Sequence, residues 1–276
     1  MTVSPVLYEQ HMHTPLCGHA QGEPEDYARV AHEHGLKGIV VTCHNPIDDG
    51  WSAGVRMSIS DFDNYTVMVE AARLEWEGRV DVRLGLESDY YPGCEPWLEK
   101  LHVMAPLHHV LGSVHPQVTD YQQRYYNGSI EDYQRLYFEH LAQAAESGLF
   151  DTLAHPDLVK NSDPAGWDLD RVMDSVCASL DRIAATRTAM ELNTSGLHKL
   201  VPEMNPGPRI LAEMQQRGIP VVIGADAHVP NRVAADFVDA LNELSTVGYT
   251  EVTNFLDRQR IDIPIETARA SLSAAD

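Results

Sequence analysis

The stretch Gly38-Ile-Val-Val-Thr-Cys-His44 is a short apolar run that ends on a histidine, and this pattern recurs along the chain. Its β-branched residues do not alternate with polar ones, which is typical of a strand buried on both faces of a parallel sheet. Six more runs of this kind are predicted to be strands. They are Leu7–His13, Val82–Asp89, His109–His115, Thr152–His155, Ala189–Asn193 and Pro220–Ala225.

Helix-length segments separate these runs, and several carry helix-ending or capping residues. Gly35 is a typical helix C-cap, and Ser60-x-x-Asp63 and Ser129 are typical of helix starts. The predicted helices are Glu25–His34, Asp61–Trp76, Glu95–Met104, Ile130–Glu146, Leu169–Thr186, Pro208–Arg217 and Arg232–Leu244.

The regular alternation of strand and helix predicts a parallel α/β fold. Seven such units in one chain predict a TIM-like (β/α)7 barrel with one unit fewer than the common eight, and residues 1–276 are expected to form a single domain. The segment after Gly248 is predicted to start as a helix and, with the stretch Ile261–Ile265, to cap the barrel.

Histidines and carboxylates fall at the ends of the predicted strands or in the loops that follow. In a parallel barrel these positions all meet at one face, so the side chains are expected to converge there. Imidazole and carboxylate ligands suit zinc, iron or manganese, and the set is large enough for two or three divalent ions. The predicted metal ligands are His11, His13, His19, His44, Glu87, His115, His155, Asp226 and His228.

The remaining histidines have positions that need no metal. His32 and His34 lie in the last turn of a predicted helix, where a partial positive charge is favourable. His102 and His140 lie on predicted helices, and His108 lies at a strand entrance. We assign these five no functional role.

Six motifs of this chain together resemble the polymerase-and-histidinol-phosphatase (PHP) family. The resemblance is highly specific and spans residues 11–228, and it is greatest to the histidinol-phosphate phosphatases, through Cys17-Gly-His-Ala20 and Glu191-Leu-Asn-Thr-Ser-Gly-Leu197. The motifs are His11-Met-His-Thr-Pro-Leu-Cys-Gly-His-Ala20, Thr42-Cys-His-Asn-Pro46, Gly85-Leu-Glu-Ser-Asp-Tyr90, Gly112-Ser-Val-His115, Ala154-His-Pro-Asp157 and Gly224-Ala-Asp-Ala-His228.

The family implies a distorted seven-stranded barrel with three metal ions. Carried over motif by motif, one ion is held by His11, His13, Glu87 and Asp226. Glu87 bridges to a second ion, which His115 and His155 also hold, and His19, His44 and His228 hold the third. The implied reaction is hydrolysis of a phosphate monoester by a metal-bridging hydroxide. The predicted catalytic residues are Glu87, Asp226 and His228.

The sequence departs from the family pattern at two places. Cys43 stands where an acidic residue usually precedes the histidine of the second motif, which affects how the metals are tuned. His198-Lys199 follows Gly196-Leu197 where the phosphatases tend to have Arg-Lys. His198 is therefore a weaker phosphate donor, a proton donor to the leaving group, or a plain loop residue, and the sequence leaves these three alternatives open.

Basic side chains near the strand ends are expected to bind the phosphate. Phosphate sites in barrels often form in the loops after the last strands, where Lys199 and Arg232 lie. The predicted substrate-binding residues are Arg56, Lys160, His198, Lys199 and Arg232. L-Histidinol phosphate also carries an amine, and Asp89 or Asp157 is predicted to receive it by a charge-assisted hydrogen bond.

Composition limits the alternatives. Twenty basic and 41 acidic residues give a formal net charge of −21, which disfavours binding to nucleic acid. No signal peptide or membrane span is visible, and four scattered cysteines indicate reduced thiols, so a cytoplasmic protein is expected.

The preferred substrate is histidinol phosphate, in histidine biosynthesis, with a nucleotide or sugar phosphate as the alternative. A module tied to DNA synthesis is disfavoured, and the oligomeric state is not predicted.

Overall fold

A barrel of parallel strands forms the centre of the computed structural model, which describes residues 4–273. Within that range the barrel sheet has seven strands, and each pairs in parallel with the next along the chain. They are β1 (Tyr8–Glu9), β2 (Gly38–Val41), β3 (Asp81–Asp89), β4 (His109–Ser113), β5 (Thr152–Leu153), β6 (Ala189–Asn193) and β7 (Val221–Gly224). The predicted fold class is confirmed.

The first and last strands of the barrel meet just beyond their ends. The backbone N–H of His13 donates to the carbonyl of Ala227 at 2.9 Å, and the N–H of Ala227 donates to the carbonyl of His11 at 3.0 Å. Met12 and Ala227 thereby form an isolated parallel bridge. The barrel is nearly closed by these two bonds, beside the residues predicted to hold metal.

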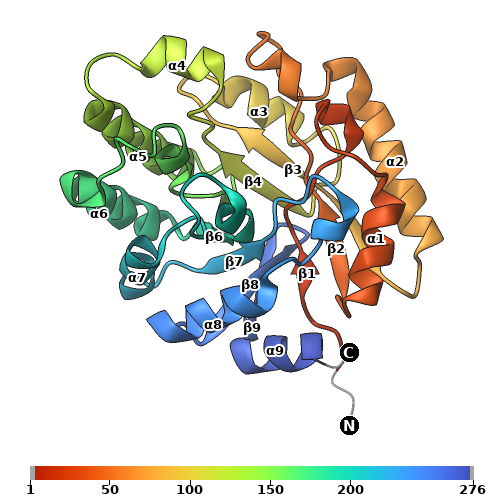
Figure 1. The fold of residues 1–276 in the computed structure, drawn as a ribbon. Helices are drawn as coiled ribbons and strands as arrows, with labels where there is room; N and C mark the ends of the chain where they lie inside the picture. The colour runs from red at the N-terminus through yellow and green to blue at the C-terminus, as the bar shows by residue number, and fades with distance from the viewer. Residues whose placement is uncertain (1–3, 274–276) are drawn as a thin grey trace.

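Helices lie outside the strands and cover the barrel (Figure 1). The described helices are α1 (Pro24–Glu33), α2 (Phe62–Glu75), α3 (Glu95–Leu101), α4 (Thr119–Tyr125), α5 (Ile130–Glu146), α6 (Leu169–Thr186), α7 (Pro208–Gln216), α8 (Phe237–Val247) and α9 (Ile265–Ser273). Short 3₁₀ turns occupy Pro15–Cys17, Ala53–Val55, Ile59–Asp61, Leu158–Asn161, Thr194–His198 and Pro230–Arg232.

Helix α5 begins as predicted, because the Ser129 hydroxyl accepts the N–H of Asp132 at 3.1 Å. The predicted cap at Ser60 is wrong. Ser58 and Asp61 form the capping box instead, at the 3₁₀ turn that leads into α2. The helix predicted from Arg232 is also displaced: Pro230–Arg232 is a 3₁₀ turn, and α8 starts only at Phe237.

Several strands end before the histidines that were predicted to close them. β1 stops at Glu9 because the N–H of His11 donates to the Glu9 carboxylate at 3.1 Å instead of pairing with a neighbouring strand. β5 stops at Leu153, and His155 then adopts a positive φ of 31°, which a strand does not allow. The histidines therefore lie on the first irregular residues beyond the strands.

The chain after Gly248 forms a hairpin followed by a helix, so the predicted helical start is wrong. Strands β8 (Glu251–Leu256) and β9 (Gln259–Pro264) pair antiparallel and lead into α9. The hairpin is fastened to the amino end of the barrel, where the Gln10 side chain bonds the backbone of Phe255 in both directions, at 2.9 and 3.1 Å. The hairpin thus covers the end opposite the predicted metal ligands.

The apolar side chains of strands and helices form one large buried core around the barrel, with a small cluster of Ala189, Val222 and Phe255 under the hairpin. All four cysteines are free. Within residues 4–273, no helix is both long and apolar enough to cross a membrane.

Candidate metal centre

The carboxyl end of the barrel brings together all nine predicted metal-ligating side chains. They come from six strand ends and one loop, and six of them are buried. His11 and His13, two residues apart, turn to the same side, with ring centroids 5.4 Å apart. The irregular backbone beyond each strand aims the rings inward instead of into the barrel wall.

Glu87, near the end of β3, lies at the centre of this cluster. Its Oε2 atom is 3.5 Å from His11 Nε2, 3.6 Å from His13 Nε2 and 2.8 Å from His44 Nδ1. Its Oε1 atom is 3.4 Å from His115 Nε2 and 3.0 Å from His155 Nε2. The two carboxylate oxygens therefore face two different sets of imidazoles, as a bridging ligand requires.

Three overlapping groups of ligand atoms are each compact enough to surround an ion. The ligand atoms of His11, His13 and Asp226 lie within 4.8 Å of one another, and so do those of His11, Glu87 and His155. A third group is formed by His19, His44 and His228, in which His19 Nε2 and His228 Nε2 are 3.0 Å apart. His44 also belongs to a group with His13 and Glu87, so it lies between the sites.

The outward-facing nitrogens of four rings are held by hydrogen bonds. His11 Nδ1 pairs with Glu191 Oε1 at 2.7 Å, and His115 Nδ1 pairs with Asp89 Oδ1 at 2.9 Å. The Nδ1 atoms of His19 and His228 pair with backbone carbonyls, those of Cys17 and Asp226, at 2.9 and 3.0 Å. A ring held in this way presents its Nε2 lone pair to a metal.

Gly224, the last residue of β7, makes room for one of these pairs. A Cβ atom at this position would lie 2.1 Å from Glu191 Oε1 and 2.8 Å from the Cβ of His11. Any side chain here would displace the carboxylate that orients His11. The glycine is therefore part of the support of the site although it offers no ligand atom.

The two carboxylates of the cluster are held in their charged form. Burial raises the pKa of Glu87, but the surrounding imidazoles, His44 first, outweigh burial and hold that pKa well below its usual range. Burial is likewise outweighed at Asp226, where His11 and His13 keep the pKa of the carboxyl well below its usual range. Both groups are therefore anions available to a cation.

The imidazoles divide into two kinds. Burial lowers the pKa of His13 and of His44 to about 4, so both rings are neutral at pH 7 and carry a free lone pair. For His115, Asp89 and Glu87 outweigh burial and raise the pKa to about 10. An ion must therefore displace a proton from His115, which makes metal uptake release protons.

The residues present fit divalent metal ions. His11 Nε2 and Glu87 Oε2 are buried and form no hydrogen bond of suitable geometry, although they lie 3.5 Å apart and His44 Nδ1 lies 2.8 Å from Glu87 Oε2. Such an arrangement is costly unless a cation lies between the atoms. His155 and Asp226 also hold positive φ angles of 31° and 50°. Strained backbone of this kind persists where surrounding structure enforces it, commonly at functional sites.

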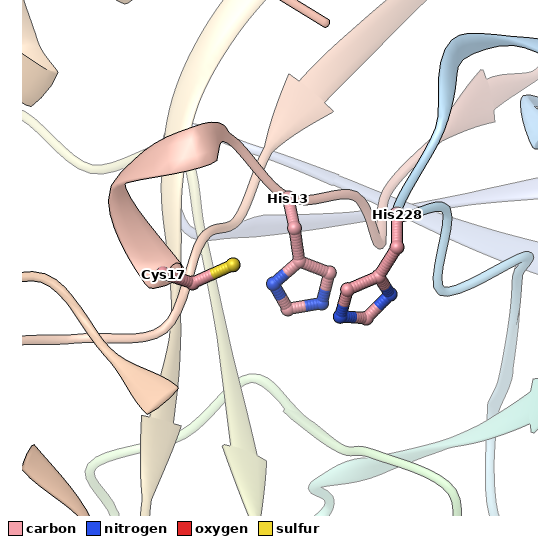
Figure 2. Close-up of side chains that lie close together, drawn as sticks. All are labelled: His13, Cys17 and His228. Carbon is pink, nitrogen blue, oxygen red and sulfur yellow. The ribbon is translucent and has the colours of Figure 1, made fainter. Parts of the chain in front are cut away.

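One residue next to the cluster was not predicted from the sequence. Figure 2 shows the sulfur of Cys17 facing the His13 ring, with His228 on the other side of that ring. Cys17 is buried, and His13 Nδ1 has no hydrogen-bond partner. The available signal was its position inside the motif that joins His13 to His19.

A cavity of about 600 Å³ opens above the metal-ligand cluster. Lys199 and Arg56 line it, as the prediction of phosphate-binding residues requires. Lys199 Nζ lies 3.5 Å from Asp226 Oδ2. Arg56 is buried, donates to Asp89 and Asn45, and keeps its Nε without a hydrogen-bond partner.

Three predicted phosphate-binding residues lie elsewhere. Lys160 is fully buried, and its ammonium group donates to Asp157 Oδ2, Glu203 Oε1 and the carbonyl of Met204 at 2.8–3.1 Å. These bonds use all three of its donors within the protein, so the ammonium group has none left to offer a phosphate in this arrangement. His198 and Arg232 share the carboxylate of Asp236 and are not among the cavity-lining residues.

The acids predicted to receive the substrate amine are also occupied within the protein. Asp89 is buried between Arg56 and His115. Asp157 is buried and accepts hydrogen bonds from Lys160, Asn205 and the N–H of Gly207. Both carboxylates serve the internal structure, and neither is among the cavity-lining residues.

A parallel α/β barrel that gathers imidazoles and buried carboxylates in overlapping groups at its carboxyl end is the framework of a metal-dependent hydrolase. The chain belongs to the PHP domain family, whose model matches residues 9–195.

Relatives across almost the whole chain agree with this membership. A Deinococcus radiodurans protein described as "Probable histidinol-phosphatase" is 39% identical over 90% of this chain and 96% of its own length. A Bacillus subtilis histidinol-phosphatase is 26% identical over 79% of this chain and 92% of its own.

The fold is also similar to a solved structure. The histidinol phosphate phosphatase of Lactococcus lactis, crystallised with zinc, L-histidinol and phosphate, has a TM-score of 0.77. The two chains are 19% identical, and the match covers 92% of this chain and 98% of that one.

Proposed function

We propose that this protein is a metal-dependent phosphomonoesterase that hydrolyses L-histidinol phosphate to L-histidinol and phosphate, a step of histidine biosynthesis. The observation that carries the proposal is the position of Glu87, whose two oxygens face separate groups of imidazoles. The choice of ester is supported by relatives with histidinol-phosphatase names that match most of the chain.

Two or three divalent ions are proposed, with zinc, iron or manganese as candidates. His11, His13, Glu87 and Asp226 would hold one ion, and Glu87, His115 and His155 a second. The third would be held by His19, His44 and His228. Bound ions would supply Lewis acidity toward the phosphoryl oxygens and activate a water molecule for attack at neutral pH.

The side chains of this protein would position the ester and balance its charge. Lys199 lines the cavity beside Asp226, and Arg56 lines it while paired with Asp89, so the phosphate can lie near both cations. Asp89 and Asn45 hold the Arg56 guanidinium in a fixed position. A prepositioned cation needs no rearrangement as charge develops on the phosphoryl oxygens.

The experiment combines metal analysis with phosphate release. The purified protein is stripped with a chelator, reloaded with zinc, manganese or ferrous iron, and assayed on L-histidinol phosphate beside nucleotide, sugar and simple alkyl phosphates. We expect at least two ions per chain and a kcat/KM for L-histidinol phosphate at least tenfold above the other esters, about the contribution of one good polar contact. A metal-replete protein that prefers a nucleotide or sugar phosphate would overturn the substrate assignment.

A further inference from the structure

Part of the wall of the cavity above the metal-ligand cluster is formed by two loops that supply no proposed metal ligand. One wall segment is Ser52–Arg56, between β2 and α2, and the other is Gln117–Asp120, at the start of α4. Among the cavity-lining residues there are two acids, Asp226 and Asp120. Because Asp226 belongs to the proposed metal site, Asp120 is the acid left to face a substrate.

Local contacts fix the Asp120 carboxylate without neutralising it. Its Oδ2 atom accepts the backbone N–H of Ser52 at 3.0 Å, and no basic side chain of the described residues forms an ion pair with it. Ser52 is itself anchored, because the neighbouring Trp51 is buried and stacks on Tyr91 with ring centroids 4.0 Å apart. The carboxylate is thus a prepositioned anion on the cavity wall.

The charge distribution of the cavity suits a substrate with two opposite charges. Lys199 and Arg56 supply positive charge toward a phosphate, and Asp120 supplies negative charge on the loop wall. Asp120 is exposed, whereas Asp89 and Asp157 are buried near this end and already paired with cations of the protein. Among the described cavity-lining residues, Asp120 is therefore the carboxylate outside the metal cluster that a protonated amine can bind.

We propose that Asp120 is a specificity-determining residue that binds the ammonium group of the leaving alcohol. The inference rests on the proposed function, because L-histidinol phosphate bears an ammonium on the carbon next to its phosphorylated carbon. The contact is a charge-assisted hydrogen bond from the ammonium to the Asp120 carboxylate. It selects phosphate monoesters of cationic amino alcohols over uncharged phosphate esters of similar size.

The test compares two esters on two variants. L-Histidinol phosphate is assayed beside 3-(imidazol-4-yl)propyl phosphate, which has the same ring and phosphate but no amine. Asp120→Asn keeps an oxygen for the Ser52 N–H and removes the charge. Asp48→Asn, at an exposed acid that precedes the same wall segment and does not line the cavity, is the matched control.

We expect Asp120→Asn to lower kcat/KM for L-histidinol phosphate by about 10-fold or more, the effect of one charge-assisted contact, and to leave the amine-free ester within about twofold. Asp48→Asn changes neither. Binding of L-histidinol alone, measured by calorimetry on the metal-loaded protein, weakens in parallel for Asp120→Asn.

An equal fall for both esters, or no fall for either, would overturn the role of Asp120 while the proposed function stands. A wild-type protein that hydrolyses neither ester would overturn the proposed function and this inference together.

Discussion

The two ends of the barrel use the same kinds of polar residue in opposite ways. At the amino end, the Asp151 carboxylate accepts the N–H of Val110 at 2.8 Å and pairs with Arg258 from the hairpin turn. Gln10 is bonded in both directions to Phe255. At the carboxyl end, Glu87 and His11 are as deeply buried, yet Glu87 Oε2 and His11 Nε2 have no hydrogen-bond partner.

The contrast distinguishes a structural polar group from a functional one. Buried polar groups are normally satisfied within the protein, so a group of buried ligand atoms without partners indicates something that the chain itself does not contain. At the amino end, Asp151 and Gln10 find their partners within the protein, and these polar contacts should matter for stability. The carboxyl end needs a cation, and its contacts should matter for metal content and activity.

Glu87→Gln should give the largest effect and act only on the carboxyl end. The amide cannot balance two cations, so we expect kcat/KM to fall by about 1,000-fold or more, beyond the 10–100-fold typical of residues that merely support a ligand. Metal content should fall by at least one ion, while the far-ultraviolet circular dichroism stays that of the wild type. Near-normal turnover would show that Glu87 does not bridge the ions.

Two lysines at the carboxyl end, Lys160 and Lys199, sharpen the comparison. All the hydrogen-bond donors of the Lys160 ammonium are occupied within the protein, as at the amino end, whereas Lys199 lines the cavity. Lys199→Met should lower kcat/KM by about 10-fold with stability nearly unchanged, since it removes one cation from the cavity wall. Lys160→Met should instead lower the free energy of unfolding by about 3 kcal/mol, because Asp157 is left buried and uncompensated. Steady-state kinetics and urea unfolding separate the two, and a Lys160 variant with normal stability but weak substrate binding would contradict this division.

Arg258→Ala tests the amino end. Its guanidinium binds the Asp151 carboxylate and the carbonyl of Leu149, and without it Asp151 keeps only a backbone partner. We expect the free energy of unfolding to fall by about 1–3 kcal/mol with kcat unchanged. Arg260→Ala, which removes an exposed pair with Asp262 in the same hairpin, should cost less than about 1 kcal/mol. A large loss of activity in Arg258→Ala would show that the two ends are coupled.

At neutral pH the smallest effect is expected for His109, which acts only on the acid stability of the amino end. Burial, with Arg258 nearby, lowers the pKa of His109 to about 3, below the usual 6.5. Between these values the unfolded chain binds a proton that the folded protein excludes, so stability is lost as the pH falls. His109→Asn should flatten the slope of unfolding free energy against pH by up to about 1.4 kcal/mol per pH unit. The exposed His32→Asn serves as control, and an unchanged slope in His109→Asn would contradict the assignment.

The barrel was predictable because each strand is a short apolar run and a helix-length segment follows it in the sequence. The bounds of α5, α6 and β6 agree with the sequence prediction, since Ser129 is a strong cap and these elements have clear edges. The predicted strand ends at His13 and His155 lie beyond the observed ends at Glu9 and Leu153. There the backbone leaves the sheet to present side chains, and a composition pattern carries no information on that turn.

The hairpin was missed for a chemical reason. Its two-residue turn, Asp257-Arg258, has positive φ at both residues, 53° and 59°, a geometry usually marked by Asn-Gly or Asp-Gly. Here Arg258 adopts it while bound to Asp151, a partner 107 residues away. The burial of Lys160 was not predicted for a similar reason, because its acceptors Glu203 and Met204 lie far from it in the sequence. The nine converging side chains were predictable because strand ends meet whatever the distant contacts are.

The closure of the barrel between His13 and Ala227 also bears on the order of folding. His11 and His13 follow the first strand and Asp226 and His228 follow the last, so the site joins segments separated by more than two hundred positions of sequence. Closing such a loop carries a large entropic cost, and contacts of high sequence separation form slowly. A nascent or refolding chain thus acquires its complete ligand set only when the barrel closes, which makes full metal loading one of the last events in its maturation.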